Sequence, residues 1–84
     1  MSERQKMNVE IYWQLYTLRV APEDKANLEK IARRVDEMMR QVGGGQSHLD
    51  YRDVAVLAAM NIAEEYFKLQ KEYQELVTIL DDEK

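Results

Sequence analysis

The sequence predicts an α+β protein with an N-terminal β-hairpin, a charged helix, and a long C-terminal helix that forms an intermolecular coiled coil. Two short segments of alternating apolar and polar residues indicate the hairpin, and an amphipathic segment after Pro22 indicates the first helix. An apolar stripe with heptad-like spacing in the last third of the chain indicates the coiled coil. The predicted organisation is a disordered N-terminus at residues 1–6, a small α+β head at residues 7–68 and a coiled-coil extension at residues 69–84.

Two strands are predicted over Met7–Tyr12 and Tyr16–Val20, because apolar side chains occupy alternate positions in both segments. Only the residues from Trp13 to Leu15 separate the segments, so the strands form a hairpin. The turn lacks an Asn-Gly or Asp-Gly pair, which leaves its type open. Trp13 at the tip has two interpretations: it packs on a partner subunit, or it is an anchor for binding another molecule.

The first helix begins near Pro22, a residue that suits a helix start, and ends at the run Gly43–Gly45. An acidic residue precedes an arginine by four positions twice on this helix, at Glu29 to Arg33 and Asp36 to Arg40, which favours surface ion pairs. The apolar face, which we expect to cover the head core, consists of Leu28, Ile31, Val35, Met38 and Val42.

The second helix runs from about Asp50, a suitable N-cap, to Asp82. Residues 54–63 are apolar on nearly all sides, so we expect them to be buried on all sides, with Asn61 making a hydrogen bond that fixes the packing. From Leu69 onward only a narrow apolar stripe remains between charged residues, as in a coiled coil. The residues assigned to oligomerisation are Asn61, Ile62, Tyr66, Leu69, Tyr73, Leu76 and Leu80.

The composition disfavours several classes of function. The chain has no cysteine, which excludes thiolate metal sites, and its net charge of −4 argues against nucleic-acid binding. We interpret the single histidine, His48, as a solvated loop residue, and without a nucleophile–base pair or a metal set we predict no enzyme and no cofactor. No apolar stretch is long enough to span a membrane and no signal peptide is visible, which predicts a cytoplasmic protein.

Four segments of the chain occur in a characteristic order and spacing: Val9–Tyr12, Tyr16–Arg19, Val35–Arg40 and Val54–Glu65. The most specific of them lies between Leu57 and Glu65. In these segments the chain resembles the ZapA family of bacterial cell-division proteins, which associate with the tubulin-like ring protein FtsZ. The resemblance extends from about Val9 to Lys71.

The resemblance implies a homodimer, or a dimer of dimers, that crosslinks FtsZ protofilaments at the division septum and promotes ring assembly. It implies no catalysis and no cofactor. The net charge and the lack of a long apolar stretch predict no nucleic acid and no membrane as a partner. The alternative is a generic coiled-coil dimeric adaptor, or a chaperone-like protein, that is unrelated to FtsZ.

Charged residues of the head are linked to FtsZ in this family, and by position the resemblance indicates Arg19 and Arg52. The exposed face of the first helix adds four candidates, which are Arg33, Arg34, Glu37 and Arg40. Each of them can also be an ordinary solvated charge with a partner on its own helix. The family usually has glycine where Trp13 stands, and tryptophan does not readily adopt the positive φ that glycine permits. Either the turn differs here, or the tryptophan is an introduced change.

Overall fold

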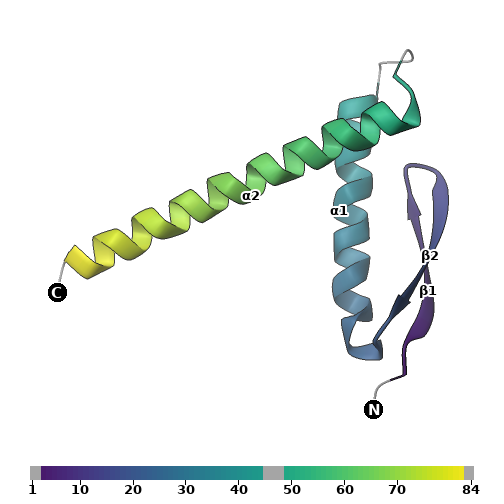
Figure 1. The fold of residues 1–84 in the computed structure, drawn as a ribbon, viewed down its shortest axis with the longest axis horizontal. Coiled ribbons are helices and arrows are strands. Elements are labelled where there is room, and N and C mark those ends of the chain that lie inside the picture. Colours follow the sequence, from purple (N-terminus) through teal and green to yellow (C-terminus); the bar gives the residue numbers. More distant parts are fainter. Residues whose placement is uncertain (1–2, 45–48, 83–84) are drawn as a thin grey trace.

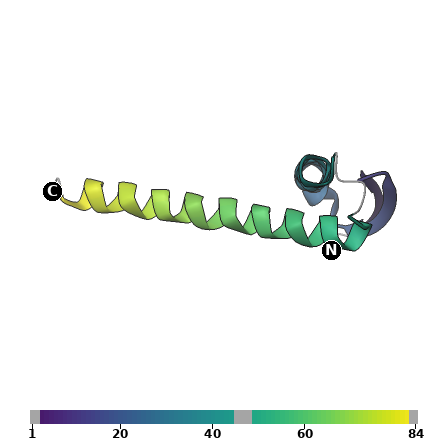
Figure 2. The ribbon, with the colours of Figure 1, turned by 90° about the horizontal axis from the view of Figure 1, so that it is seen from above.

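The computed structural model describes residues 3–44 and 49–82, and it confirms the predicted α+β fold. A two-stranded antiparallel sheet is followed by two helices, α1 over Lys25–Gly43 and α2 over Tyr51–Asp82. Figure 1 shows the hairpin and α1 side by side, with α2 crossing one end of α1 and projecting far beyond it. Seen from above, α2 leaves the head as a single rod (Figure 2). Most of its length therefore has nothing from the same chain packed on it.

The hairpin pairs β1, Gln5–Ile11, with β2, Gln14–Val20, and each strand begins two residues earlier than predicted. The prediction assigns Gln5 and Lys6 to a disordered terminus, but both lie in β1. Their partners on β2 extend the ladder to that point, since Gln5 lies opposite Val20. At the other end Ile11 lies opposite Gln14, so the connection is two residues long rather than three.

Tyr12 and Trp13 form the turn, and both have positive φ, 50° and 65°. Two successive positive values are the pattern of a type I′ turn, whose twist matches that of the strands. Trp13 therefore adopts the conformation that the sequence made unexpected for a bulky side chain. One contact explains how: the backbone N–H of Tyr12 donates a hydrogen bond to Oδ1 of Asp36 on α1, at 2.7 Å. The conformation of the turn is therefore stabilised by this contact with α1, and not by the backbone preferences of Tyr12 and Trp13.

The core consists of two clusters of buried side chains. One lies between the hairpin and the first half of α1 and contains Met7, Val9, Val20 and Ala32. The other joins the end of α1 to the start of α2 and contains Met38, Met39, Val54 and Ala58. Gly43 favours this approach of α1 to α2, because a Cβ there would lie 3.1 Å from Cγ1 of Val54.

The predicted apolar face of α1 is correct except at Ile31. Ile31 was expected to be buried but is 49 % exposed, whereas its neighbour Ala32 is buried. The sheet contacts the stripe that contains Ala32 and Met39, seven residues apart on one side of the helix. Met38 is buried as predicted. The other predicted members of this face are half-buried, namely Leu28, Val35 and Val42.

The start of α2 agrees with the prediction, because Oδ1 of Asp50 accepts a hydrogen bond from the Asp53 N–H at 2.9 Å. The predicted burial of residues 54–63 on all sides is wrong for the single chain. Val54 and Ala58 are buried, but Val56 and Met60 are 54 % and 64 % exposed. The head packs on only one side of the helix, which leaves the other apolar positions open. Gly45 and His48 lie outside the described residues.

Candidate functional site

A cluster at the hairpin tip joins the turn to α1; it consists of Tyr12, Trp13, Asp36 and Arg40, and we call it the tip cluster. Asp36 accepts two hydrogen bonds, one from the Tyr12 N–H and one from Arg40 Nε at 2.9 Å. The Arg40 guanidinium lies over the Trp13 ring, 4.3 Å from its centroid, which is a cation–π arrangement. Arg40 was predicted to bind FtsZ, and the predicted Asp36–Arg40 ion pair is confirmed.

The pKa of the Asp36 carboxyl lies below its ordinary value of 3.8. The backbone hydrogen bond from Tyr12 is the largest cause, followed by the hydrogen bond from Arg40. Both donors stabilise the charged form more than the protonated form. The contribution of Asp36 to stability is therefore present above about pH 4 and is lost as the pH falls through its lowered pKa.

We expect Asp36→Ala to lower the free energy of unfolding by about 2 kcal/mol at neutral pH, because it removes a charge-assisted acceptor of two hydrogen bonds. Urea unfolding followed by circular dichroism measures the loss. The difference from the unchanged chain should shrink as the pH falls below about 4, where Asp36 of the unfolded chain becomes protonated, and it should be lost once the pH passes the lowered pKa of the folded chain. A difference that stays constant down to about pH 3 would contradict the assigned role.

Arg34 connects the two helices. Its Nη2 donates hydrogen bonds to both carboxylate oxygens of Glu65 on α2, at 2.7 Å for Oε2, and its Nη1 lies 3.8 Å from Glu37. One guanidinium nitrogen is thus shared between both oxygens of the Glu65 carboxylate, in a charge-assisted contact between the two helices. Arg34 and Glu37 were both predicted to bind FtsZ. Within the described part of the chain, they take part in a contact that supports the angle at which α2 leaves the head.

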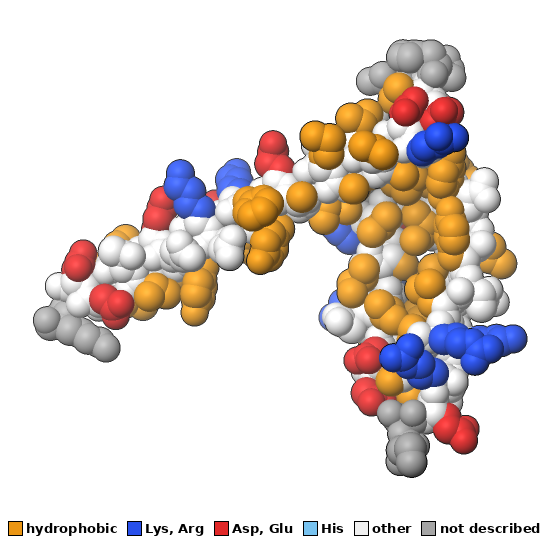
Figure 3. All heavy atoms as spheres, in the orientation of Figure 1, with side chains coloured by type: hydrophobic (Ala, Val, Ile, Leu, Met, Phe, Trp, Pro, Cys, Tyr) orange, Lys and Arg blue, Asp and Glu red, His pale blue; other side chains and the backbone are white. Residues whose placement is uncertain are grey.

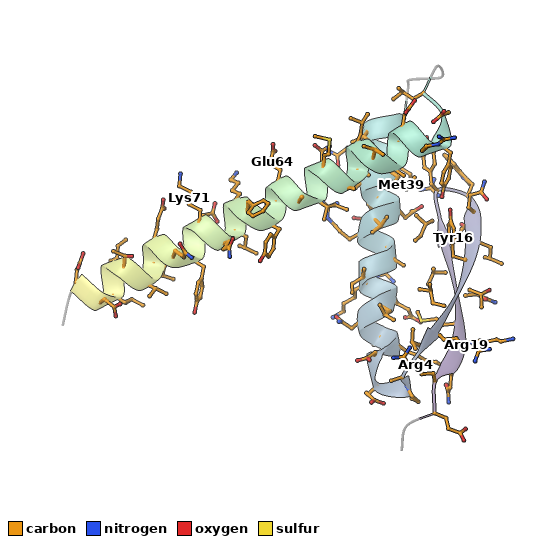
Figure 4. All side chains as sticks on the ribbon, in the orientation of Figure 1. Arg4, Tyr16, Arg19, Met39, Glu64 and Lys71 are labelled. Atoms are coloured by element: carbon orange, nitrogen blue, oxygen red, sulfur yellow. The ribbon has the colours of Figure 1, made fainter. Side chains whose placement is uncertain are left out.

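Three basic residues gather at the open end of the hairpin, namely Arg4, Lys6 and Arg19, and we call them the basic surface. Lys6 lies directly opposite Arg19 in the strand register, so both side chains point to the same face of the hairpin. Arg4 and Arg19 line one shallow depression, and Figure 4 shows them close together. Like charges directly opposite each other destabilise a hairpin by about 0.2–1 kcal/mol. The stability of the hairpin therefore does not explain why two basic residues, Lys6 and Arg19, lie opposite each other.

The remaining candidates lie elsewhere. Arg33 lines a groove between α1 and β1 together with Glu10 and Glu29. Arg52 is exposed in the first turn of α2. The six residues predicted to bind FtsZ therefore do not form one cluster, because Arg19 lies on the hairpin, Arg34 faces α2, and Arg40 stacks on the turn.

Apolar side chains line two hollows that share Val35, Met39 and Ala55, and we call the combined surface the apolar face. One hollow lies between α1 and the first half of α2 and extends to Ile62 and Tyr66. The other lies between the hairpin and the two helices, and its further lining residues are Val9, Ile11, Tyr16, Leu18 and Tyr51. Figure 3 shows hydrophobic side chains in orange continuing from α2 over α1 to the hairpin.

Two tyrosines close one end of the apolar face. The hydroxyl of Tyr16 on β2 hydrogen-bonds the hydroxyl of Tyr51 at the start of α2. Burial, together with the Tyr16 hydroxyl, raises the pKa of Tyr51 to about 12. Tyr51 is therefore neutral at physiological pH, and the apolar face gains no charge from it.

The stripe on α2 continues the apolar face beyond the head, and we call it the seam. Ile62 and Tyr66 belong to both surfaces, since they line the first hollow and hold positions in the stripe. The other members, Leu69, Tyr73, Leu76 and Leu80, are all exposed in the single chain. Asn61 is also exposed, so the hydrogen bond predicted for it has no partner among the described residues of this chain. The residues predicted to act in oligomerisation thus lie along the apolar face and the seam, except Asn61, which is adjacent to the seam residue Ile62.

The described residues offer neither a metal-binding cluster nor a membrane-spanning helix. Among residues 3–44 and 49–82, no group of three or more His, Cys, Asp or Glu side chains could hold a metal ion. In the same ranges, no helix is both long and apolar enough to cross a membrane.

Sequence reasoning missed Arg4 and Lys6 of the basic surface and the contact that joins the tip cluster to the turn. Arg4 and Lys6 fall in residues 1–6, which the prediction assigns to a disordered terminus. The register was the signal that could have found them, since a two-residue turn at Tyr12–Trp13 places Lys6 opposite Arg19. The contact between Asp36 and the Tyr12 N–H joins residues 24 positions apart, and no local pattern reveals it.

Comparison with known proteins gives consistent matches over nearly the whole chain. The sequence profile described as "Cell division protein ZapA" matches residues 7–83. A protein called "Cell division protein ZapA" from Geobacillus sp. (strain WCH70) is 40 % identical over 86 aligned positions, which cover 100 % of this chain and 98 % of the relative. Its namesake from Bacillus pumilus (strain SAFR-032) is 38 % identical and covers 84 % of this chain and 82 % of its own.

Two solved structures share the fold. One is described as "ZapA mutant dimer from Geobacillus stearothermophilus"; it is 38 % identical with a TM-score of 0.69 and covers 96 % of this chain and 93 % of its own. The other is described as "Unknown conserved bacterial protein from Pseudomonas aeruginosa PAO1", with 24 % identity and a TM-score of 0.79. It covers 93 % of this chain and 86 % of its own, and at that identity it supports the fold alone.

Proposed function

The chain belongs to the ZapA family of cell division proteins, which are not enzymes, and from this premise we propose that it binds FtsZ filaments and crosslinks them through a self-associated stalk. The observation that carries the proposal is the family match over residues 7–83, which includes both the head and the stalk. We further propose that the protein acts in the cytoplasm at the division septum.

Self-association is supported by the apolar face and the seam. Together they leave large side chains such as Leu69 and Tyr73 exposed in a chain of 84 residues. Contiguous apolar surface of this extent is typical of an interaction site rather than of a monomer's solvent-facing surface. The solved relative described as a dimer favours the same conclusion. We propose a homodimer, and analytical ultracentrifugation distinguishes it from a dimer of dimers.

Crosslinking follows from combining this association with one head per chain. Two heads on one stalk can each contact a filament. Once the first head is bound, the second head is held near the filaments at a high effective concentration. The projecting part of α2 carries most of the seam beyond the head, because the stretch from Leu69 to Asp82 contains Leu69, Tyr73, Leu76 and Leu80 and is about 20 Å long at ~1.5 Å per residue. No new chemistry is needed for this gain in avidity.

For the filament contact we propose the basic surface, with Arg19 at its centre, together with Arg33 and Arg52. Their exposure and the like-charged Lys6–Arg19 cross-strand pair support an acidic partner surface. Arg34, Glu37 and Arg40 remain candidates, but their contacts within the chain give each of them a structural role as well.

The test is co-sedimentation with FtsZ filaments assembled with GTP. Our proposal expects the protein in the pellet and an increase in light scattering from bundles. The alternative, a generic coiled-coil adaptor unrelated to FtsZ, expects neither. A protein that self-associates but stays in the supernatant at micromolar concentration would reject the FtsZ assignment.

We expect Arg19→Glu to weaken filament binding by roughly tenfold or more while leaving the head folded. The substitution turns a like-charge cross-strand pair into an attractive Glu–Lys pair, so the melting temperature should stay the same or rise slightly. Binding by the unchanged protein should also weaken with added salt, since exposed charges are screened within ~8 Å at physiological ionic strength.

Lys71→Glu is the matched control, because it makes the same charge change on the stalk, far from the hairpin (Figure 4). Binding that is reduced equally by both substitutions would indicate a general effect of net charge. In that case the basic surface is not the contact.

A further inference from the structure

The hairpin tip carries an exposed tryptophan that neither the core nor self-association explains. We propose that Trp13 and Arg40 form a binding anchor on the head for a protein surface that offers an apolar side chain beside a carboxylate. This inference rests on the proposed function, and it assigns the anchor to the same filament partner.

The Trp13 side chain is 66 % exposed but is not free to move. The Arg40 guanidinium covers one face of the indole, and the Tyr12 ring lies 4.8 Å away between centroids. Arg40 is fixed in turn by Asp36, to which Nε donates at 2.9 Å. A large side chain held in place before binding loses little conformational freedom when a partner docks. Tryptophan and arginine are also the residue types most enriched among interface hot spots.

The backbone conformation of the turn also supports a binding role for Trp13. Tyr12 and Trp13 both have positive φ, which is unfavourable for bulky residues and usual for glycine or asparagine. Such conformations persist where surrounding contacts enforce them, and they concentrate at functional positions. Here the contact is the hydrogen bond from the Tyr12 N–H to Asp36. Because most of the indole is in solvent, core packing does not account for a tryptophan at this position.

The anchor lies outside the surface used for self-association in our proposal. The two hollows of the apolar face are lined by Met39 but not by Arg40, and neither hollow includes Trp13. Successive residues of a helix point about 100° apart, so Met39 and Arg40 face different sides of α1. A partner other than a second copy of the chain can therefore reach Trp13 in the assembled protein.

The chemistry of the anchor defines its ligand. Arg40 uses Nε for Asp36, and its two Nη groups make no hydrogen bond to any described residue, so they remain as donors for a carboxylate. The open part of the indole favours an apolar or aromatic side chain. The fitting partner is therefore a protein segment in which an apolar residue stands next to Asp or Glu.

The test uses the full chain with Trp13→Gly and Trp13→Asn. Both residues tolerate the left-handed turn, so the fold should survive while the indole is removed. We expect both variants to bind GTP-assembled FtsZ filaments about tenfold more weakly, or worse, in quantitative co-sedimentation. Trp13→Phe, which keeps a flat aromatic ring, should recover part of the affinity. The melting temperature should stay within a few degrees, and sedimentation velocity should report unchanged self-association.

Three results would each contradict the proposal that Trp13 is a binding anchor. Binding by Trp13→Gly and Trp13→Asn at the affinity of the unchanged protein would reject it. So would loss of self-association in these variants, which would make Trp13 a subunit contact. A binding loss that occurs only together with a large fall in melting temperature would assign Trp13 a structural role. If the unchanged protein itself fails to bind filaments, the proposed function fails, and this inference falls with it.

Discussion

Leu76→Glu is expected to abolish self-association and, with it, the bundling of FtsZ filaments. Leu76 lies in the seam, is 54 % exposed in the single chain, and would be covered only by a second chain. A carboxylate at this position must be desolvated in each of two chains when the seam closes. We expect a loss of about 3 kcal/mol or more, which is over a hundredfold in the dissociation constant. Sedimentation velocity at micromolar concentration measures the result.

The matched control is Thr78→Glu, which introduces the same charge two residues away and outside the seam. It should self-associate as the unchanged protein does, because Thr78 lies with Lys71 and Gln74 on another side of α2. Circular dichroism of Leu76→Glu should report reduced helicity, since the isolated end of α2 has no packing partner. A Leu76→Glu protein that is still fully dimeric at micromolar concentration would reject the coiled-coil seam.

The strands and helices were predictable because each leaves a local pattern. Alternation at Met7 and Val9 identifies β1, and both residues are buried as expected. Asp50 marks the start of α2 through a preference that the structure bears out directly. The turn was not predictable, because Tyr12–Trp13 lacks the residue types that adopt positive φ. Its geometry depends on Asp36, a contact over 24 residues that no local preference encodes.

Burial on α2 shows a second limit of sequence reasoning. An apolar helix segment indicates that its surface will be covered, but the pattern does not say by which chain. Val54 and Ala58 are covered by the chain's own head, whereas Val56 and Met60 remain open. The candidate site was limited in a similar way. Sequence identified Arg19, Arg34 and Arg40 as charged and exposed, but only the structure separates Arg19 from the two arginines that hold contacts within the chain.

A chain that ends at Lys68 is expected to bind filaments without bundling them. The residues that hold the head together all precede Lys68. The last residue packed on the two core clusters is Ile62, and the partner of Arg34 on α2 is Glu65. The shortened chain loses Leu69, Tyr73 and the rest of the seam. With one head per particle the second contact is no longer intramolecular, so the gain in avidity disappears.

The measurement has three parts, because the apolar face of the shortened chain also loses any cover that the second chain provides. Circular dichroism and sedimentation velocity first establish a folded monomer. Co-sedimentation then measures binding to GTP-assembled FtsZ, where we expect weak but detectable association that Arg19→Glu reduces further. Light scattering measures bundling, where we expect no increase over filaments alone. If the folded monomer bundles filaments as well as the full chain does, the protein does not act as a crosslinker. In that case the head itself must change how filaments associate with one another.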